Sequence, residues 1–144
     1  MISVAEALEQ LFALARPLGI ETVPLLQAHR RVLAQDVAAT RNQPPFDGSA
    51  MDGYAVTEVA PGLRLKVVGE SAAGHGFYQS VKSGEAVRIF TGAPVPEGAK
   101  AVVIQEDVSR DGDWITICDS PEDNDHIRPA GGDFKIGDTV RAGR

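Results

Sequence analysis

The feature that most restricts the fold of this chain is a change in composition at Arg41. From there, glycine and proline alternate with short apolar segments. Residues 63–67 alternate apolar and polar side chains, as a half-buried strand does. Residues 86–90 predict a second short strand, and residues 101–104 predict a third that is apolar enough to be buried on both faces. Several short strands at this spacing predict a barrel-like or irregular β domain.

The segment that follows predicts a hairpin. Residues 109–113 favour a turn that leads into a strand over residues 114–118. Cys118, the only cysteine, is expected to be a small core residue rather than a catalytic thiol, because no histidine lies near it in the sequence. A further turn over residues 135–138 is expected to precede a short strand at residues 139–140.

The N-terminal segment predicts a helix. Ser3 and Glu6 have the spacing of a capping box, in which each side chain accepts a hydrogen bond from the other residue's backbone N–H. Apolar residues then recur at three- and four-residue intervals and form one stripe, which is typical of an amphipathic helix. They are Val4, Leu8, Leu11, Phe12 and Ala15.

Charge and hydropathy exclude some classes of partner. The net charge of −6 argues against a broad nucleic-acid surface, which needs clustered Lys and Arg. No run reaches the ~20 apolar residues of a membrane-spanning helix. The N-terminus also lacks the basic segment of an export signal. We therefore expect a cytoplasmic protein that binds neither nucleic acid nor a membrane.

Three loops hold the candidate functional residues. The loop over residues 44–56 contains Asp47-Gly48 and Asp52-Gly53. Asp-Gly most often marks a turn, because glycine adopts left-handed backbone without steric cost, so turn aspartates are the more common interpretation. The functional alternative is that one carboxylate holds Mg²⁺, which takes one or two carboxylates together with phosphate oxygens of a substrate. Spacing alone does not choose between them.

The other two loops are less specific by themselves. Residues 69–76 are rich in glycine but lack the Lys-Ser/Thr ending of a phosphate-binding loop, which favours a flexible connection between strands. Residues 88–98 place Thr91 at the end of a strand, before a segment that Pro94 and Pro96 stiffen by fixing φ. A stiff loop lowers the entropy cost of presenting a hydroxyl to a ligand, although a hydroxyl bonded to its own loop is more common.

The three loops together resemble the MoeA family, which includes the E domain of gephyrin. The resemblance rests on PPFDGSAMDGYAV (residues 44–56), GESAAG (69–74) and RIFTGAPVPEGAKAVVIQED (88–107), in that order. It implies a homodimeric molybdopterin molybdenumtransferase that inserts molybdate into adenylated molybdopterin and releases AMP in the presence of Mg²⁺. It also implies an active site shared between one subunit's nucleotide-fold domain and the other's small β domain.

The resemblance assigns roles to five residues. It places Asp52 and Thr91 in the catalytic cleft, with Asp52 organising Mg²⁺ or a polar group of the pterin and Thr91 making a hydrogen bond to the ligand. Asp47, Ser49 and Glu106 occupy other motif positions and are expected to help bind the substrate. A hydrolase that pairs Asp47 with Asp52 is a weaker alternative, because nothing in the sequence specifies the distance between the two carboxyl groups.

The resemblance also implies a domain organisation. It predicts an α+β, mainly β fold in which residues 1–45 and 125–144 form one discontinuous unit and residues 46–124 form an inserted small β domain. Relatives carry a glutamate where this chain has Gly132, and more arginines nearby. The chain ends about where relatives enter the domain that binds molybdopterin, so we expect it to supply one wall of the site and to be inactive alone. The alternative is a non-catalytic binding or dimerisation module.

Overall fold

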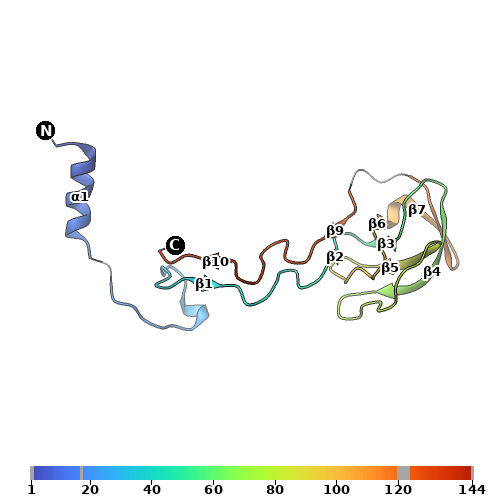
Figure 1. The fold of residues 1–144 in the computed structure, drawn as a ribbon, viewed down its shortest axis with the longest axis horizontal. Helices are drawn as coiled ribbons and strands as arrows, with labels where there is room; N and C mark the ends of the chain where they lie inside the picture. The colour runs from blue at the N-terminus through green and yellow to red at the C-terminus, as the bar shows by residue number, and fades with distance from the viewer. Residues whose placement is uncertain (1, 17, 120–123, 144) are drawn as a thin grey trace. The chain divides into compact units, whose positions relative to one another are not determined.

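A computed structural model describes residues 2–16, 18–119 and 124–143 of the chain. Its described part is mainly β with a single α-helix, which confirms the predicted fold class (Figure 1). The elements are α1 (Val4–Leu14), the 3₁₀ helix η1 (Leu25–Gln27), β1 (Val37–Ala38), β2 (Gly48–Ser49), β3 (Gly53–Val56), β4 (Arg64–Ser71), β5 (Glu85–Ile89), β6 (Ala101–Ile104), the 3₁₀ helix η2 (Gln105–Asp107), β7 (Val108–Asp111), β8 (Trp114–Ile117), β9 (Ile127–Arg128) and β10 (Thr139–Val140).

The chain divides into two compact units. One contains Met1–Val37 with Val140–Arg144, and the other contains Ala38–Thr139. The division inferred from the family resemblance, with boundaries after residues 45 and 124, stays a prediction. All of the candidate site residues fall in the second unit.

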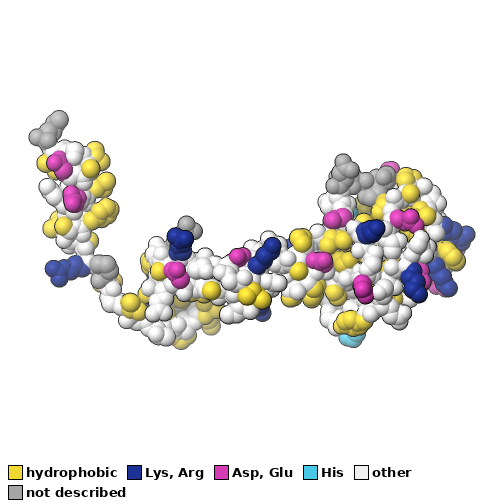
Figure 2. Space-filling view, viewed as in Figure 1, with side chains coloured by type: hydrophobic (Ala, Val, Ile, Leu, Met, Phe, Trp, Pro, Cys, Tyr) yellow, Lys and Arg dark blue, Asp and Glu magenta, His cyan; other side chains and the backbone are white. Residues whose placement is uncertain are grey.

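Helix α1 begins as the sequence predicts. Ser3 Oγ accepts the backbone N–H of Glu6 at 3.2 Å, and Glu6 Oε2 accepts the backbone N–H of Ser3 at 2.7 Å, which completes the capping box. The backbone N–H of Ser3, together with its hydroxyl, which donates to Glu6 Oε2 at 2.9 Å, lowers the pKa of the Glu6 carboxyl. No residue of α1 is buried, and Figure 2 shows apolar side chains exposed along the helix. The predicted apolar stripe is therefore present, and none of the helix residues that form it is buried among the described residues.

A six-stranded curled sheet forms the centre of the second unit (Figure 1). Its strand order is β6-β3-β5-β4-β8-β7. Strand β3 runs antiparallel to both of its neighbours, whereas β4 and β5 are parallel and their register shifts between Val67 and Gly69. The parallel pair requires a crossover, and the connection over residues 72–84 supplies it.

Strands β3, β5 and β6 of this sheet are buried on both faces. Tyr54 and Val56 of β3 pack on one face, and Ala55 between them packs on the other, as the alternation of a strand requires. Val103 and Val102 of β6 divide between the faces in the same way, which confirms that this strand is buried on both sides. The first cluster is Tyr54, Val56, Leu65, Ala86, Val103, Ile115 and Ile117, and the second is Ala55, Val81, Val87, Ile89, Ala93 and Val102.

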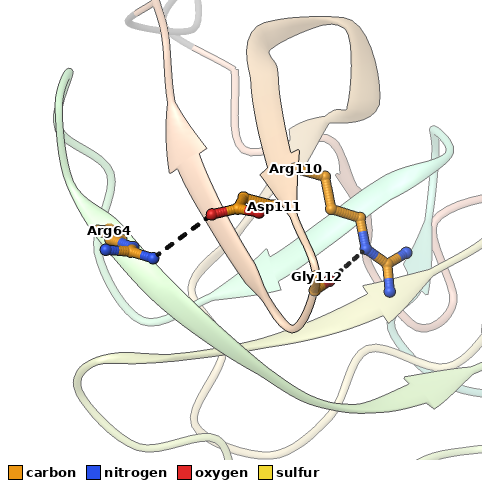
Figure 3. A network of polar contacts seen from close by, with 4 residues as sticks. All are labelled: Arg64, Arg110, Asp111 and Gly112. Atoms are coloured by element: carbon orange, nitrogen blue, oxygen red, sulfur yellow. Dashed lines mark hydrogen bonds and ion pairs between the residues drawn. The ribbon is translucent and has the colours of Figure 1, made fainter.

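The predicted hairpin is formed by β7 and β8 (Figure 3). Asp111 pairs with Trp114, so the loop is two residues long, and Gly112 adopts a φ of +59° there. Arg110 Nε donates to the Gly112 carbonyl at 3.0 Å. The expectation that Cys118 is a core residue was wrong, because strand β8 ends at Ile117 and the Cys118 side chain is exposed just after it.

Two extended segments connect this sheet with the short pair β1 and β10. Residues 38–48 and 127–139 run beside each other in Figure 1, and the Gln43 N–H donates to the Phe134 carbonyl at 2.9 Å. The predicted turn before β10 is present, since the Asp138 N–H donates to the Lys135 carbonyl at 3.0 Å. Among the described residues, no helix is long and apolar enough to cross a membrane.

Candidate functional site

The topology of the sheet brings three segments of the motifs together at one end of strands β3, β5 and β6. Asp52 directly precedes β3, Thr91 lies two residues after the last residue of β5, and Gln105 directly follows β6. Because β3 is antiparallel to both β5 and β6, its beginning lies beside the ends of its two neighbours. Residues that are far apart in the sequence therefore meet at this end of the three strands.

Asp52 and Thr91 form the centre of the candidate site. Oδ1 of Asp52 accepts the backbone N–H of Thr91 at 2.7 Å and the Thr91 hydroxyl at 2.8 Å. These two hydrogen bonds, with a smaller contribution from the positive charge of Arg88, lower the pKa of the Asp52 carboxyl below its usual value. Asp52 is therefore ionised at neutral pH, and Oδ2 is not used by either bond from Thr91.

The loops that contain Ser49 and Thr91 are joined by their backbones. The Ser49 N–H donates to the Ala93 carbonyl at 2.9 Å, and the Gly92 N–H donates to the Ser49 carbonyl at 2.8 Å. Ser49 is buried, and its hydroxyl donates to the Met51 carbonyl at 2.6 Å. This bond holds the short segment that leads to Asp52. The substrate-binding role expected of Ser49 stays a prediction.

Asp47 is bonded to a segment near the C-terminus of the chain and to the loop that follows Thr91. Its Oδ1 accepts the backbone N–H of Ala130 at 2.7 Å, and its carbonyl accepts the Val95 N–H at 2.8 Å. Asp47 thus links the loop over residues 44–56 to two other loops. Its expected binding role is untested, but its carboxylate bonds to a different segment from that of Asp52.

Glu106 lies in η2 and is exposed. Its Oε1 accepts the side-chain amide of Gln105 at 3.2 Å, and the Gln105 backbone N–H donates to the Asp52 carbonyl at 3.1 Å. Glu106 is therefore linked to Asp52 through Gln105, and in the described part of the chain it makes no hydrogen bond or ion pair with Asp52 or Thr91. Its predicted role in substrate binding stays a prediction.

An open hollow of about 380 Å³ lies beside the pair. Thr91 and Ser49 line it, together with the aromatic residue Phe46 and the basic residue Arg128. The remaining lining residues are Gln43, Pro44, Pro45, Gly48, Ala50 and Gly92. Mostly apolar walls with a few polar groups are typical of sites for small organic ligands. A guanidinium and a hydroxyl add the chemistry needed to bind an anion.

Arg128 is restrained by a neighbouring carboxylate. Its Nη2 donates to Asp133 Oδ1 at 2.7 Å, and both side chains are about half exposed. The backbone between them turns, since the Gly132 N–H donates to the Pro129 carbonyl at 3.0 Å. A Cβ at Gly132 would lie 3.1 Å from that carbonyl oxygen, so a residue with a side chain would require a local adjustment here.

The two Asp-Gly pairs are not left-handed turns. Gly48 lies in β2 and Gly53 in β3, and neither has a positive φ. At Gly53 the requirement is space, because an added Cβ would lie 2.0 Å from the Val103 carbonyl oxygen on β6. Glycine there lets two strands approach closely immediately after Asp52. The interpretation of both aspartates as turn residues was therefore wrong.

The glycine-rich loop is a tight turn rather than a loose connection. Ala72 and His75 exchange backbone hydrogen bonds of 2.9 Å in both directions, and Gly74 between them has a φ of +80°. The buried Ser71 hydroxyl at the end of β4 donates to the Pro94 carbonyl at 2.7 Å. The second motif thus supports the loop that presents Thr91.

The donor set fits a magnesium ion only in part. No cluster of three or more His, Cys, Asp or Glu side chains able to hold a metal occurs among the described residues. Asp52 alone offers a single carboxylate, which suits a Mg²⁺ ion that takes most of its ligands from substrate phosphates and water. A site built entirely from protein ligands is not present in the described part of the chain.

Sequence reasoning missed three residues of this region. Phe46 and Arg128 line the hollow, and Arg88 contacts the residues that flank the pair. Arg88 begins the third motif and Arg128 lies in the arginine-containing stretch near the C-terminus, but neither position shows by itself which surface its side chain reaches. Their part in the site depends on the tertiary structure.

Comparison with known proteins gives one consistent result. Residues 2–144 match the family described as MoeA N-terminal region (domain I and II). The chain is similar to a molybdopterin molybdenumtransferase from Haemophilus influenzae, with 44% identity over 86% of this chain and 31% of that protein. It is 41% identical to molybdopterin molybdenumtransferase 2 from Mycobacterium tuberculosis, over 83% of this chain and 31% of that protein.

A solved structure gives the same result. A molybdopterin biosynthesis moeA protein from Pyrococcus horikoshii OT3 superposes with a TM-score of 0.76 at 38% sequence identity. The match covers 85% of this chain and 35% of that one. This chain thus spans about a third of the length of the relatives it matches.

Proposed function

Because this chain belongs to the family of MoeA N-terminal regions, we propose that it acts as the N-terminal part of a molybdopterin molybdenumtransferase. The proposed reaction inserts molybdate into adenylated molybdopterin and releases AMP. The chain would contribute one wall of the active site, formed by the hollow and the Asp52–Thr91 pair. The observation that carries the proposal is that pair, in which two of the family's motifs meet through hydrogen bonds of 2.7 and 2.8 Å.

The residues of the hollow have distinct proposed roles. Thr91 and Arg128 would bind anionic oxygens of the substrate, because a hydroxyl and a guanidinium both donate to such groups. Phe46, with 43% of its surface exposed, would offer a flat apolar surface to the planar pterin. Asp47, Ser49 and Glu106 would support the site from its margins, as the family motif positions imply.

Asp52 would act as a permanently charged group. Its lowered pKa argues against a general acid, which must hold a proton at working pH, and so weakens the alternative of a hydrolase with paired carboxylates. Asp52 would hold Mg²⁺, and the bound ion would supply positive charge against the phosphate of the substrate.

A chimaera tests the proposal directly. This chain would replace the matching N-terminal third of the Haemophilus influenzae enzyme, and AMP release from adenylated molybdopterin would be measured with molybdate and Mg²⁺. We expect release by the chimaera and a loss of tenfold or more with Asp52→Asn. Asp113→Asn, in the exposed loop of the β7–β8 hairpin, is the matched control and should retain full release.

Two outcomes would contradict the proposal. One is a chimaera that unfolds cooperatively at the temperature of the parent enzyme but releases no AMP. The other is an Asp52→Asn variant as active as the Asp113→Asn control. Either result would remove the role proposed for the pair and leave the binding-module alternative.

We also propose a homodimer, with the apolar stripe of α1 as part of its interface. Five large apolar side chains of the helix are exposed, and Phe12 has 71% of its surface exposed. Exposed apolar surface of this kind is typical of protein–protein contacts. This observation equally favours the alternative of a non-catalytic dimerisation module. The AMP-release measurement separates the two, while the expected cytoplasmic location stays a prediction.

A further inference from the structure

Arg88 is a half-buried residue of the sheet whose guanidinium contacts both backbone and side-chain groups. It lies on β5 directly opposite Tyr54 of β3. Its Nη1 donates to the Gly53 carbonyl at 3.1 Å, and its Nη2 donates to the Gln105 side-chain oxygen at 2.7 Å. The guanidinium carbon lies 5.1 Å from the centroid of the Tyr54 ring and 4.7 Å from that of the Phe90 ring. Hydrogen bonds and aromatic rings thus fix the guanidinium from several directions.

The partners of Arg88 are the immediate neighbours of the site. Gly53 follows Asp52 in the chain, and Phe90 precedes Thr91. Gln105, which accepts a hydrogen bond from Arg88, also bonds directly to Asp52, because its backbone N–H donates to the Asp52 carbonyl at 3.1 Å. One guanidinium therefore contacts all three strand ends that meet at the Asp52–Thr91 pair.

The geometry of these contacts requires arginine. A planar guanidinium can donate to two acceptors and stack on aromatic rings at the same time. A lysine ammonium keeps the positive charge but lacks the planar fork, so it cannot hold the same two acceptors in the same directions. Charge and geometry can therefore be separated by substitution.

We propose that Arg88 is a positioning residue, which holds the ends of β3, β5 and β6 so that the Asp52 carboxylate receives both hydrogen bonds from Thr91. Its importance for the reaction rests on the proposed function, but its effect on the pair does not. Arg88 itself does not line the hollow, and its action on a ligand passes through Asp52 and Thr91.

The test uses nuclear magnetic resonance of the 144-residue chain. The pKa of the Asp52 carboxyl is measured from its carbon shift, and the hydrogen bond of the Thr91 amide from the temperature dependence of its proton shift. In both Arg88→Lys and Arg88→Gln we expect the Asp52 pKa to rise toward its usual value and the Thr91 amide bond to weaken. Arg88→Lys separates geometry from charge, because it retains the positive charge near Asp52.

Arg64 provides a matched control. It also lies on a strand of the sheet, with its guanidinium carbon 5.0 Å from the Trp114 ring centroid, and its Nη2 lies 3.9 Å from Asp111 Oδ2 (Figure 3). It belongs to the β4–β8 side of the sheet and contacts none of the three strand ends. Arg64→Gln should therefore leave the Asp52 pKa and the Thr91 amide hydrogen bond unchanged.

A second variant decides the question if the Arg88 substitutions do not fold. Gln105→Ala removes one acceptor of the fork but keeps Arg88 and the backbone N–H that bonds to Asp52. Gln105→Ala should raise the Asp52 pKa and weaken the Thr91 amide bond, by smaller amounts than the Arg88 substitutions do. The inference is overturned if folded variants of Arg88 and Gln105 keep the wild-type Asp52 pKa and Thr91 amide bond while only the unfolding midpoint falls.

Activity provides a separate readout. In an active chimaera, Arg88→Gln should lower kcat/KM by about 10–100-fold, because small displacements of a positioned group are costly. An inactive wild-type chimaera would contradict the proposed function, whereas the resonance measurements on the chain would still decide whether Arg88 positions the pair. The two failures are therefore distinguishable.

Discussion

Thr91 donates its backbone N–H and its side-chain hydroxyl to the same oxygen of Asp52, at 2.7 and 2.8 Å. The two residues are 39 positions apart in the chain, and the antiparallel pairing of β3 with β5 brings them together. Because both donors stabilise the charged form, the carboxylate is held ionised and in a fixed direction. Several measurable consequences follow from this relationship.

The first prediction separates the two donors. Thr91→Val keeps the backbone N–H but removes the hydroxyl, so the Asp52 pKa should rise only part of the way to its usual value, since the backbone bond is the larger cause of its lowering. Thr91→Ser retains the hydroxyl and should leave the pKa nearly unchanged. Carbon-detected titration of the Asp52 carboxyl gives both values. A complete return to the usual pKa in Thr91→Val would show that the backbone bond contributes nothing.

The second prediction concerns pH and stability. Because the folded-state pKa of Asp52 is lowered, its contribution to stability is fully present above the unfolded-state value of about 3.9 and is lost as the pH falls through the lower folded-state value. Urea unfolding of the wild type and of Asp52→Asn should therefore differ at pH 7 and converge as the pH falls below about 4. A difference that stays constant down to acidic pH would contradict the lowered pKa.

The third prediction compares the two Asp-Gly glycines. Gly53→Ala should destabilise the chain by at least the roughly 1–3 kcal/mol typical of overpacking, because the new Cβ would lie 2.0 Å from a backbone oxygen that cannot easily move. Gly48→Ala places its Cβ 3.9 Å from the Ala93 carbonyl oxygen, which is an ordinary contact, and should change stability much less. Chemical unfolding of the two variants, measured side by side, checks the difference. Equal losses would show that close strand approach is not the reason for glycine at position 53.

The fourth prediction concerns the support of the Thr91 loop by Ser71. Ser71→Ala removes a buried hydroxyl that donates to the Pro94 carbonyl at 2.7 Å, which should cost about 1–3 kcal/mol of unfolding free energy. Ser83→Ala, whose hydroxyl makes an exposed bond to Glu58, should cost well under 1 kcal/mol. Amide hydrogen exchange at residues 91–93 and at Val95 should also accelerate in Ser71→Ala alone. Unchanged exchange there would mean that Ser71 does not restrain the loop.

The fifth prediction concerns assembly. If the apolar stripe of α1 is part of a dimer interface, Leu11→Glu should shift sedimentation toward the monomer, because the interface would have to bury a charge. Glu9→Gln, on the same helix, should leave the dimer intact. Analytical ultracentrifugation over a range of concentrations provides the measurement. A dimer that persists unchanged in Leu11→Glu would place the interface elsewhere.

Much of the local structure follows from the sequence because short-range rules control it. The capping box of Ser3 and Glu6 lies within one helical turn, and the β7–β8 hairpin is set by a two-residue loop with glycine. The strand over residues 101–104 was predicted to be buried on both faces because every side chain in it is apolar. These features need no knowledge of distant parts of the chain.

The candidate site depended on both the sequence motifs and the tertiary structure. The three motifs, through the family resemblance, predicted Asp52 and Thr91 as site residues, whereas turn chemistry favoured ordinary turns at the Asp-Gly pairs. Long-range contacts decided the outcome. Strand β6 leaves no room for a Cβ at Gly53, and Arg88 on β5 reaches Gly53 on β3 and Gln105 at the end of β6. The local sequence around Asp52 contains neither piece of information.

The sequence by itself determined the family, the mainly β class and the motif residues, because these depend on residue identity and spacing along the chain. Only the tertiary structure decided which donor holds Asp52, why Gly53 must be glycine, and that Cys118 lies on the surface. The physical reason is that hydrogen bonds and steric limits act between neighbours in space. In a sheet whose strand order departs from the chain order, those neighbours are dozens of residues apart.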